Sequence, residues 1–200
     1  KDYVDEARAA FEGAYFTGIV TDFVSEQEIE SGKLTRYKLV VVPRASHAPD
    51  AVVKALNGYI QNGGIVMTVG RCFMKDEYGR PRKQGLVQSG RGRLVAYTDP
   101  LTAHAYREIL DRLLDEAMAT RSVRIEGVHG EPVWGVNVRA VETDSRLLVN
   151  LLNLSREPRL VRLVTKPAAS HALNLMDGKE MEFPFTLLPL EPVLLVLKLR

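Results

Sequence analysis

The hydrophobic pattern of this chain changes its period near residue 120, and this change limits the available folds more than any other feature. Before that point, stretches with helical spacing alternate with short apolar runs. After about Ser122, apolar residues recur at every second position, and no helical stripe is present. The first pattern is typical of an α/β layer and the second of a small antiparallel β structure. We therefore expect two domains, residues 1–121 and 122–200.

Strand-like and helical segments alternate through the first domain. Helical spacing marks residues 3–16, 26–32, 48–64 and 101–120, and strand-like runs lie at 19–25, 37–43, 65–70 and 93–99. The run YKLVVVP (37–43) is almost continuously apolar, which suits a parallel strand covered on both faces. This order predicts a flavodoxin-like, doubly wound α/β layer.

One strand of that layer is missing from the sequence. A flavodoxin-like sheet has the strand order 2-1-3-4-5, so its first strand is central. This chain begins directly with a helical pattern, and the strands expected at 19–25 and 37–43 would flank an empty position. The gap would leave two rows of unpaired backbone groups in the core. We therefore expect that Lys1 is not a natural start, and that the preceding polypeptide supplies the strand, covalently or as a separate fragment.

The second domain is expected to be a small antiparallel β-sandwich. Its apolar runs are VWGVNVRAVETD (133–144), RLLVNLLNLS (146–155), RLVRLVTK (159–166), HALNLMDGKEME (171–182) and a last stretch from 185 onward. Turn signals such as Asp177-Gly178 separate these runs.

Composition and charge exclude several classes of function. The net charge of +2 gives no case for a nucleic-acid or anionic-membrane partner. No apolar run approaches the roughly 20 residues that span a bilayer, and the charged N-terminus is unlike a signal peptide. A single cysteine excludes an internal disulfide, and the histidines lack ligand spacing. We expect no metal, no cofactor and a cytoplasmic location.

Cys72 follows an apolar run where α/β enzymes often place a nucleophile. In class I glutamine amidotransferases the nucleophile occupies a G-x-C-x-G elbow, and a distant His-x-Glu pair activates it. Here the elbow position falls at Gly70, and Arg71 and Phe73 stand where small residues would be needed. The one His-x-Glu sequence, His129-Gly130-Glu131, lies in the expected linker between the two domains and so does not suit the activating role. A packing or loop cysteine is therefore favoured, and no catalytic residue is assigned.

The loop at 71–92 contains the polar sequence DEYGRPR. Asp76 and Glu77 are adjacent, so on a strand they would point to opposite faces and could not easily act as an acid/base pair. A solvated turn is the favoured interpretation. The alternative is contact with a neighbouring domain or subunit, because partners collect at the carboxyl ends of parallel strands. The candidate contact residues are Arg71, Phe73, Asp76, Glu77, Arg80 and Trp134.

Trp134, the only tryptophan, allows two interpretations. It could be a platform on which a sugar stacks, but a lone tryptophan at a strand start is more often an anchor for domain packing. The packing role is favoured.

Long stretches of the sequence resemble the middle, trimerisation domain of family 42 β-galactosidases. They are TDFVSEQEIESGKLTRYKLVVVPRA (21–45) and VVKALNGYIQNGGIVMTVGRCFMKDEYGRPR (52–82). In that family an amidotransferase-like fold has lost its nucleophile, and the loop commonly carries a pair like Asp76-Glu77. The second half is similar to the family's C-terminal β domain, in VWGVNVRAVETDSRLLVNLLNLSREPRLVRL (133–163) and LNLMDGKEMEFPFTLLPLEPVLLVLKL (173–199).

The resemblance implies a non-catalytic C-terminal segment of a glycoside hydrolase whose (β/α)₈ barrel lies upstream of Lys1. The retaining pair of carboxylates, about 5 Å apart, would lie in that barrel. The middle domain would join subunits into a trimer or dimer and help wall a neighbour's substrate pocket. Two alternatives remain: a stand-alone amidotransferase-like enzyme that uses Cys72, and a carbohydrate-binding module.

Overall fold

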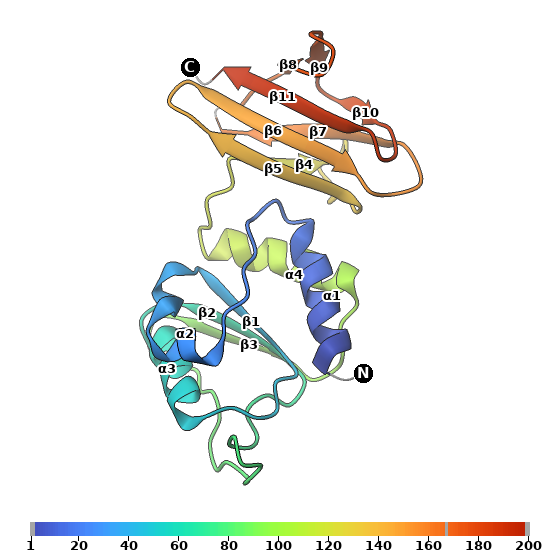
Figure 1. The fold of residues 1–200 in the computed structure, drawn as a ribbon. Helices are drawn as coiled ribbons and strands as arrows, with labels where there is room; N and C mark the ends of the chain where they lie inside the picture. Colours follow the sequence, from blue (N-terminus) through green and yellow to red (C-terminus); the bar gives the residue numbers. More distant parts are fainter. Residues whose placement is uncertain (1–2, 167, 199–200) are drawn as a thin grey trace. The chain divides into compact units, whose positions relative to one another are not determined.

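A computed structural model describes residues 3–166 and 168–198, so the expectations about Lys1 lie outside the described residues. Within these ranges the chain has a mixed α/β fold with one parallel and two antiparallel sheets (Figure 1). The chain divides into two units: Lys1–Gly13 with Thr21–Ala119, and Ala14–Val20 with Thr120–Arg200. The second unit is thus assembled from two separate stretches of sequence.

A three-stranded parallel sheet forms the centre of the first unit. Its strands are β1 (Leu39–Pro43), β2 (Ile65–Val69) and β3 (Arg93–Tyr97), in the order β1-β2-β3. The register places Val41 opposite Met67, and Met67 opposite Val95. All side chains of the central β2 are buried, whereas most of those of β1 are only half-buried. The parallel strands expected at 37–43, 65–70 and 93–99 are confirmed.

The helices of the first unit also follow the predicted pattern. They are α1 (Tyr3–Tyr15), α2 (Glu26–Glu30), the 3-10 helix η1 (Lys33–Arg36), α3 (Asp50–Gln61) and α4 (Ala103–Glu116). Ser25 and Glu28 form a capping box that starts α2. The apolar stripe of α3, including Val52, Leu56 and Ile60, packs into the core of the unit.

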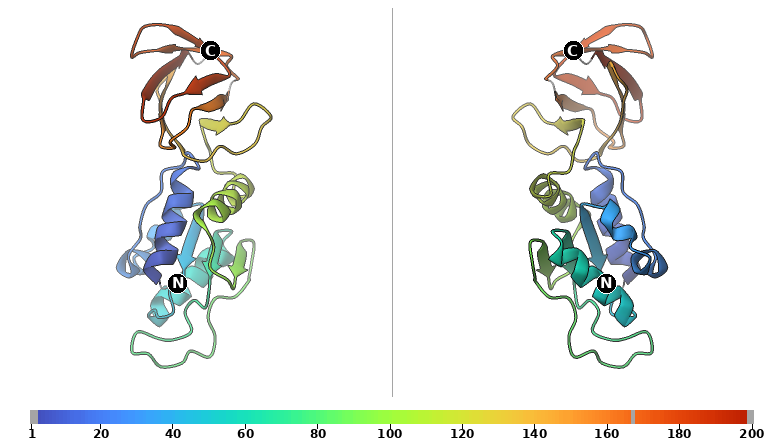
Figure 2. Two further views of the ribbon diagram at one scale, coloured as in Figure 1. Left: turned by 90° about the vertical axis from the view of Figure 1, so that its right-hand side faces the viewer. Right: turned by 90° about the vertical axis from the view of Figure 1, so that its left-hand side faces the viewer.

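The face of helix α1 that is buried is not its most apolar face. Gly13 lies so close to α4 that an added Cβ atom would come within 2.5 Å of the Cβ atom of Tyr106. Ala9 and Ala10 are buried with it, and α1 and α4 lie against each other (Figure 2). Val4 and Phe11, which share the larger apolar stripe of α1, are exposed. Small side chains therefore determine which face of α1 is buried.

The strand expected at 19–25 is wrong. These residues run as irregular chain between α1 and α2 and belong to no sheet. A strand needs a neighbour to pair its backbone groups, and no strand of the described residues pairs with this segment. Its aromatic residue Phe23 instead stacks on Phe11, with ring centroids 5.4 Å apart.

The second unit consists of two antiparallel sheets. Its strands are β4 (Val123–Glu126), β5 (Val136–Glu142), β6 (Arg146–Asn153), β7 (Arg159–Thr165), β8 (His171–Asn174), β9 (Glu180–Glu182), β10 (Phe185–Leu187) and β11 (Pro192–Lys198). The sheet orders are β10-β7-β4 and β5-β6-β11-β8-β9. Inward side chains of both sheets share one core, which includes Leu151, Leu163 and Leu195. The predicted antiparallel pairing is confirmed.

The segment Ala14–Val20 is tied to strand β5 of the second unit. The side-chain amide of Asn137 donates to the carbonyl of Tyr15 at 3.1 Å, and Arg139 donates to the carbonyl of Ile19 at 3.0 Å. The Arg139 guanidinium also lies 5.2 Å from the ring centre of Tyr15.

Across the described ranges of the chain, no helix is long and apolar enough to cross a bilayer.

Candidate functional site

The carboxyl edge of the parallel sheet is the first place to seek a site, because ligands of open α/β sheets collect there. Gly70 directly follows β2 and has a φ of 74°, a conformation that residues with a side chain rarely adopt. A Cβ atom at this position would lie 2.9 Å from Cγ of Arg44. The elbow predicted at Gly70 therefore holds no nucleophile, and the side chain of Arg44 lies beside it.

The thiol of Cys72 points back toward the sheet. Its Sγ lies 3.4 Å from the carbonyl oxygens of both Val42 and Val69, to which the thiol donates. Burial raises the pKa of Cys72, and backbone hydrogen bonds and the charge of Arg44 only partly oppose that rise. Because the thiolate is the reactive form, this environment is the opposite of one that activates cysteine.

A buried carboxylate lies at the same edge of the sheet. Glu6 on α1 is fully buried, and its Oε1 accepts hydrogen bonds from the Leu101 N–H and the Tyr106 hydroxyl, both at 3.0 Å. Burial, and then the charge of Glu6, raise the pKa of Tyr106. Sequence reasoning missed this pair, because a glutamate in the first turns of a helix is ordinarily a solvated residue.

Asp76 organises the turn at the tip of the long loop. Its Oδ1 accepts from the backbone N–H groups of Tyr78 and Arg80 at 3.0 and 2.9 Å. Its Oδ2 lies 2.6 Å from Nε of Arg80. Desolvation acts to raise the pKa of Asp76, but the hydrogen bonds from Arg80 and Tyr78 outweigh it and hold the pKa below its usual value. Asp76 thus acts within the turn.

The predicted contact residues differ in what they present to solvent. Arg71, Glu77 and Arg80 are exposed, whereas Phe73 is buried in the core of the first unit. The Arg80 guanidinium lies 4.9 Å from the ring centre of Tyr78. Met74 and Tyr78 are exposed apolar side chains of the same loop, and sequence reasoning missed them. The position of Tyr78 directly after Glu77 in a polar turn could have indicated an exposed aromatic side chain.

Trp134 belongs to the second unit. Its ring centroid lies 4.7 Å from that of Phe16, with the planes tilted by 59°. Phe16 is itself buried and lies in the Ala14–Val20 segment. The indole is thus part of the packing that attaches this segment.

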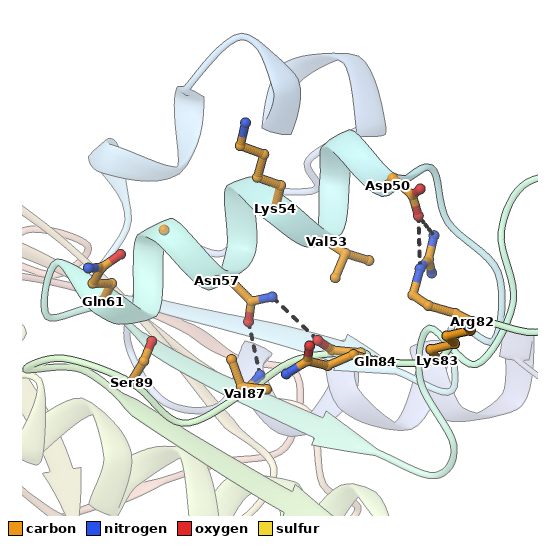
Figure 3. A pocket seen from close by; sticks show the side chains of 12 residues that line it. Asp50, Val53, Lys54, Asn57, Gln61, Arg82, Lys83, Gln84, Val87 and Ser89 are labelled. Atoms are coloured by element: carbon orange, nitrogen blue, oxygen red, sulfur yellow. Dashed lines mark hydrogen bonds and ion pairs between the residues drawn. The ribbon is translucent and has the colours of Figure 1, made fainter.

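A groove of about 670 Å³ runs between α3 and residues 82–89 of the long loop (Figure 3). Arg82 is mostly buried at one end, where it contacts Asp50 at 2.6 Å and donates to the carbonyls of Ala48, Phe73 and Lys75. Further along, the amide of Asn57 accepts from the Val87 N–H and donates to the Gly85 carbonyl. These side chains attach the loop to α3.

Side chains that could hold a metal ion are scattered through the described chain. No group of three or more His, Cys, Asp or Glu side chains suited to a metal ion is found in residues 3–166 and 168–198. The groove in Figure 3 is lined by lysine, arginine and amide side chains together with Asp50, a set poor in the carboxylates that divalent cations prefer.

These observations describe an α/β unit in which a glycine of positive φ, Gly70, follows β2 at the carboxyl edge of the sheet, and a long loop attached to α3 comes after it. Residues 1–117 match the family model described as the β-galactosidase trimerisation domain, so the chain belongs to that family. A search of curated protein sequences gave no match.

Several solved structures share the fold over nearly the whole chain. The apo exo-carrageenase GH42 from Bacteroides ovatus has a TM-score of 0.79 at 18% identity, over 100% of this chain and 27% of its own. A catalytic mutant of Gan42B, a GH42 β-galactosidase from G. stearothermophilus, scores 0.77 at 14% identity, over 99% and 36%. The β-galactosidase from Bacillus circulans sp. alkalophilus scores 0.71 at 14% identity, over 98% and 38%. The chain therefore spans about a third of the length of these proteins.

Proposed function

We propose that this chain is the non-catalytic, subunit-assembly part of a longer glycoside hydrolase of the β-galactosidase type. Its first unit would join subunits, and both units would support a (β/α)₈ catalytic barrel. The observation that carries the proposal is the family match over residues 1–117. The vacant elbow at Gly70 and the raised pKa of Cys72 support it, because both argue against nucleophilic catalysis by this sheet.

Each unit also has a proposed fold class. We assign the first unit to the flavodoxin-like, amidotransferase-like class, because its parallel order β1-β2-β3 suits the last three strands of a 2-1-3-4-5 sheet. The two antiparallel sheets of the second unit, which share one core, support a β-sandwich assignment.

The tip of the long loop is the proposed contact surface of the first unit. Tyr78 and Met74 are exposed apolar side chains, and Arg80 lies over the Tyr78 ring. Tyrosine, methionine and arginine are enriched in protein interfaces relative to the rest of a surface. The turn built by Asp76 holds these side chains in place before a partner binds, which reduces the entropy lost on association.

The native mass of the longer protein tests the assembly role. We expect three copies of the polypeptide per particle, and a Met74→Ser/Tyr78→Ser double variant that dissociates at concentrations where the parent remains assembled. Met176→Ser is the control, because the exposure of Met176 lies between those of Met74 and Tyr78 but Met176 belongs to the second unit. A particle of one copy, or equal dissociation by the control, would contradict the assembly role.

Hydrolysis tests the non-catalytic role separately. The longer protein should cleave a nitrophenyl β-galactoside, and the 200-residue chain should show no cleavage above buffer. Cys72→Ser should leave the activity of the longer protein unchanged. Cleavage by the isolated chain, or its loss in Cys72→Ser, would overturn the proposal.

A further inference from the structure

An exposed aromatic pair lies at the amino end of the parallel sheet. Phe23 is 69% exposed and stacks on Phe11 of α1, which is 40% exposed. The neighbouring Asp22 accepts a hydrogen bond at 2.7 Å from the hydroxyl of Tyr37, which lies just before β1. This bond places the aromatic pair near the end of the sheet at which the strands begin.

Acidic residues follow both aromatic residues along the chain. Glu12 comes directly after Phe11, and Glu26 lies in the first turn of α2, shortly after Phe23. Both carboxylates are exposed, and neither forms an ion pair within residues 3–166 and 168–198. The stretch at 21–32 contains no lysine or arginine. We call Phe11, Glu12, Phe23 and Glu26 the amino-end surface.

The tip of the long loop lies at the opposite end of the same sheet. The loop begins directly after β2, and the N–H of Ala48, which follows β1, donates to the Lys75 carbonyl at 3.2 Å. A five-residue strand such as β1 or β2 is about 16 Å long, so the tip and the amino-end surface are separated by roughly that length or more. The tip therefore cannot contact the amino-end surface of its own copy.

The side chains of the tip complement those of the amino-end surface. Met74 is 51% exposed and Tyr78 is 76% exposed. Glu77 is an exposed acidic residue of the tip, but basic residues outnumber it. Three basic side chains of the loop are exposed and form no ion pair within the described part of the chain: Arg71, Lys75 and Lys83. One surface is thus apolar and basic, and the other is aromatic and acidic.

We propose that the loop tip of one copy binds the amino-end surface of the next copy. Tyr78 covers the ring of Phe23, and the basic side chains of the loop lie beside Glu12 and Glu26. The contact joins two different surfaces, so it is heterologous, and each copy gives its tip to one neighbour and its amino-end surface to the other. Three such contacts close a ring in which every copy has both surfaces covered. This inference rests on the proposed assembly function and names the surface that the tip contacts.

Two observations favour a second copy over another partner. The family model that matches residues 1–117 describes a trimerisation domain, in which copies of one chain associate. A ring built from a single heterologous contact needs two complementary surfaces on each copy, and the first unit has both. Pairing of either surface with itself would bring like charges together, which disfavours a symmetric contact between two tips.

Mixing two variants of the longer protein tests this pairing. Met74→Ser/Tyr78→Ser alters only the tip, and Phe23→Ser alters only the amino-end surface. We expect each variant alone to assemble roughly 30-fold more weakly than the parent, as for the loss of interface anchors. The equimolar mixture should form a particle of two copies, one of each variant, because each keeps the surface that the other lacks. Native mass measures all three samples, and Met176→Ser, in the second unit, is the control.

Charge reversal gives an independent measurement that leaves every apolar side chain in place. Lys75→Glu and Glu26→Lys should each weaken assembly roughly 10-fold, because like charges then meet across the contact. A chain that carries both substitutions should regain most of the loss, since opposite charges meet again. Both side chains are exposed, so folding should be unaffected. Glu180→Lys, an exposed site in the second unit, should leave assembly unchanged.

The contrary outcomes separate this inference from the assembly function on which it rests. A parent particle of one copy would overturn both. Full assembly of Phe23→Ser, together with dissociation of the tip variant, would keep the assembly function and show that the tip binds another surface. Failure of the two variants to associate when mixed, or no recovery in the chain with both charge reversals, would overturn the heterologous contact.

Discussion

Equally strong hydrophobic patterns predicted the five-stranded antiparallel sheet and the three-stranded parallel sheet. The two sheets differ in how many of their strands have a neighbour on each side. Strand β6 pairs with β5 on one side and β11 on the other along nearly its whole length. In the parallel sheet only β2 has two neighbours, and β1 keeps an apolar, half-buried sequence at an open edge. The antiparallel unit contains its own partners, whereas the parallel sheet ends where another strand would fit.

The two cases show that a strand pattern becomes a strand only when a partner is present. RLLVNLLN (146–153) alternates buried side chains with exposed or half-buried ones and forms β6 as expected. IVTDFVS (19–25) has a similar apolar content but remains irregular. The difference lies in the neighbours, because the hydrogen bonds of a strand are made between segments.

The largest expected effect lies in the complete unit. Leu151→Ala removes a fully buried side chain of β6 and should lower the free energy of unfolding by about 2–5 kcal/mol. Leu160→Ala in β7, where the side chain is 51% exposed, should change it by less than about 0.5 kcal/mol. Urea unfolding followed by the fluorescence of Trp134 measures both. Similar values for the two variants would contradict the shared core.

A smaller effect is expected at the contact of α1 with α4. Gly13→Ala should cost about 1–3 kcal/mol, because the added methyl group meets Tyr106, the Ala103 carbonyl and the backbone of Arg107. Gly58→Ala is the matched control, since Gly58 is also helical and nothing lies within 4 Å of its added Cβ atom. That variant should gain up to about 1 kcal/mol from helix propensity. Stabilisation by both substitutions would show that α1 does not pack closely on α4.

The exposed stripe of α1 sharpens the comparison further. Val4→Ser should change the stability of the 200-residue chain by less than about 0.5 kcal/mol, because the side chain is mostly solvated. Thermal unfolding of the parent and the variant provides the measurement, and a loss of more than about 1 kcal/mol would show that this face of α1 is buried.

The smallest expected effect concerns the pH dependence of the loop tip. The pKa of Asp76 is held below 3.8, so its stabilising contribution is complete above the unfolded-state pKa and is lost as the pH falls through the lower folded-state value. The amide proton shifts of Tyr78 and Arg80 should therefore titrate with a midpoint below 3.8. Asp76→Asn keeps an acceptor oxygen and should remove the titration. A midpoint above the ordinary aspartate value would contradict the turn geometry.

Part of the site could be predicted from its residues alone. The absence of a nucleophile at Gly70 and the polar turn at DEYGRPR are local features of sequence. The burial of Phe73 and Arg82 could not be predicted, because each depends on contacts with residues that lie far away along the chain. Arg82 becomes buried only where the backbone carbonyls of Ala48, Phe73 and Lys75 converge on it.

The sequence by itself determined the alternation of helices and strands up to residue 120, the antiparallel character of the residues beyond it, and the family to which the chain belongs. Hydrophobic period and turn residues are properties of neighbouring positions, so they are readable without a structure. Only the tertiary structure decided that α1 buries its small residues, that Glu6 is enclosed, and that residues 19–25 form no strand. Each of these depends on which segments pack against one another, and the hydrophobic period of a single segment does not identify the segment that it packs against.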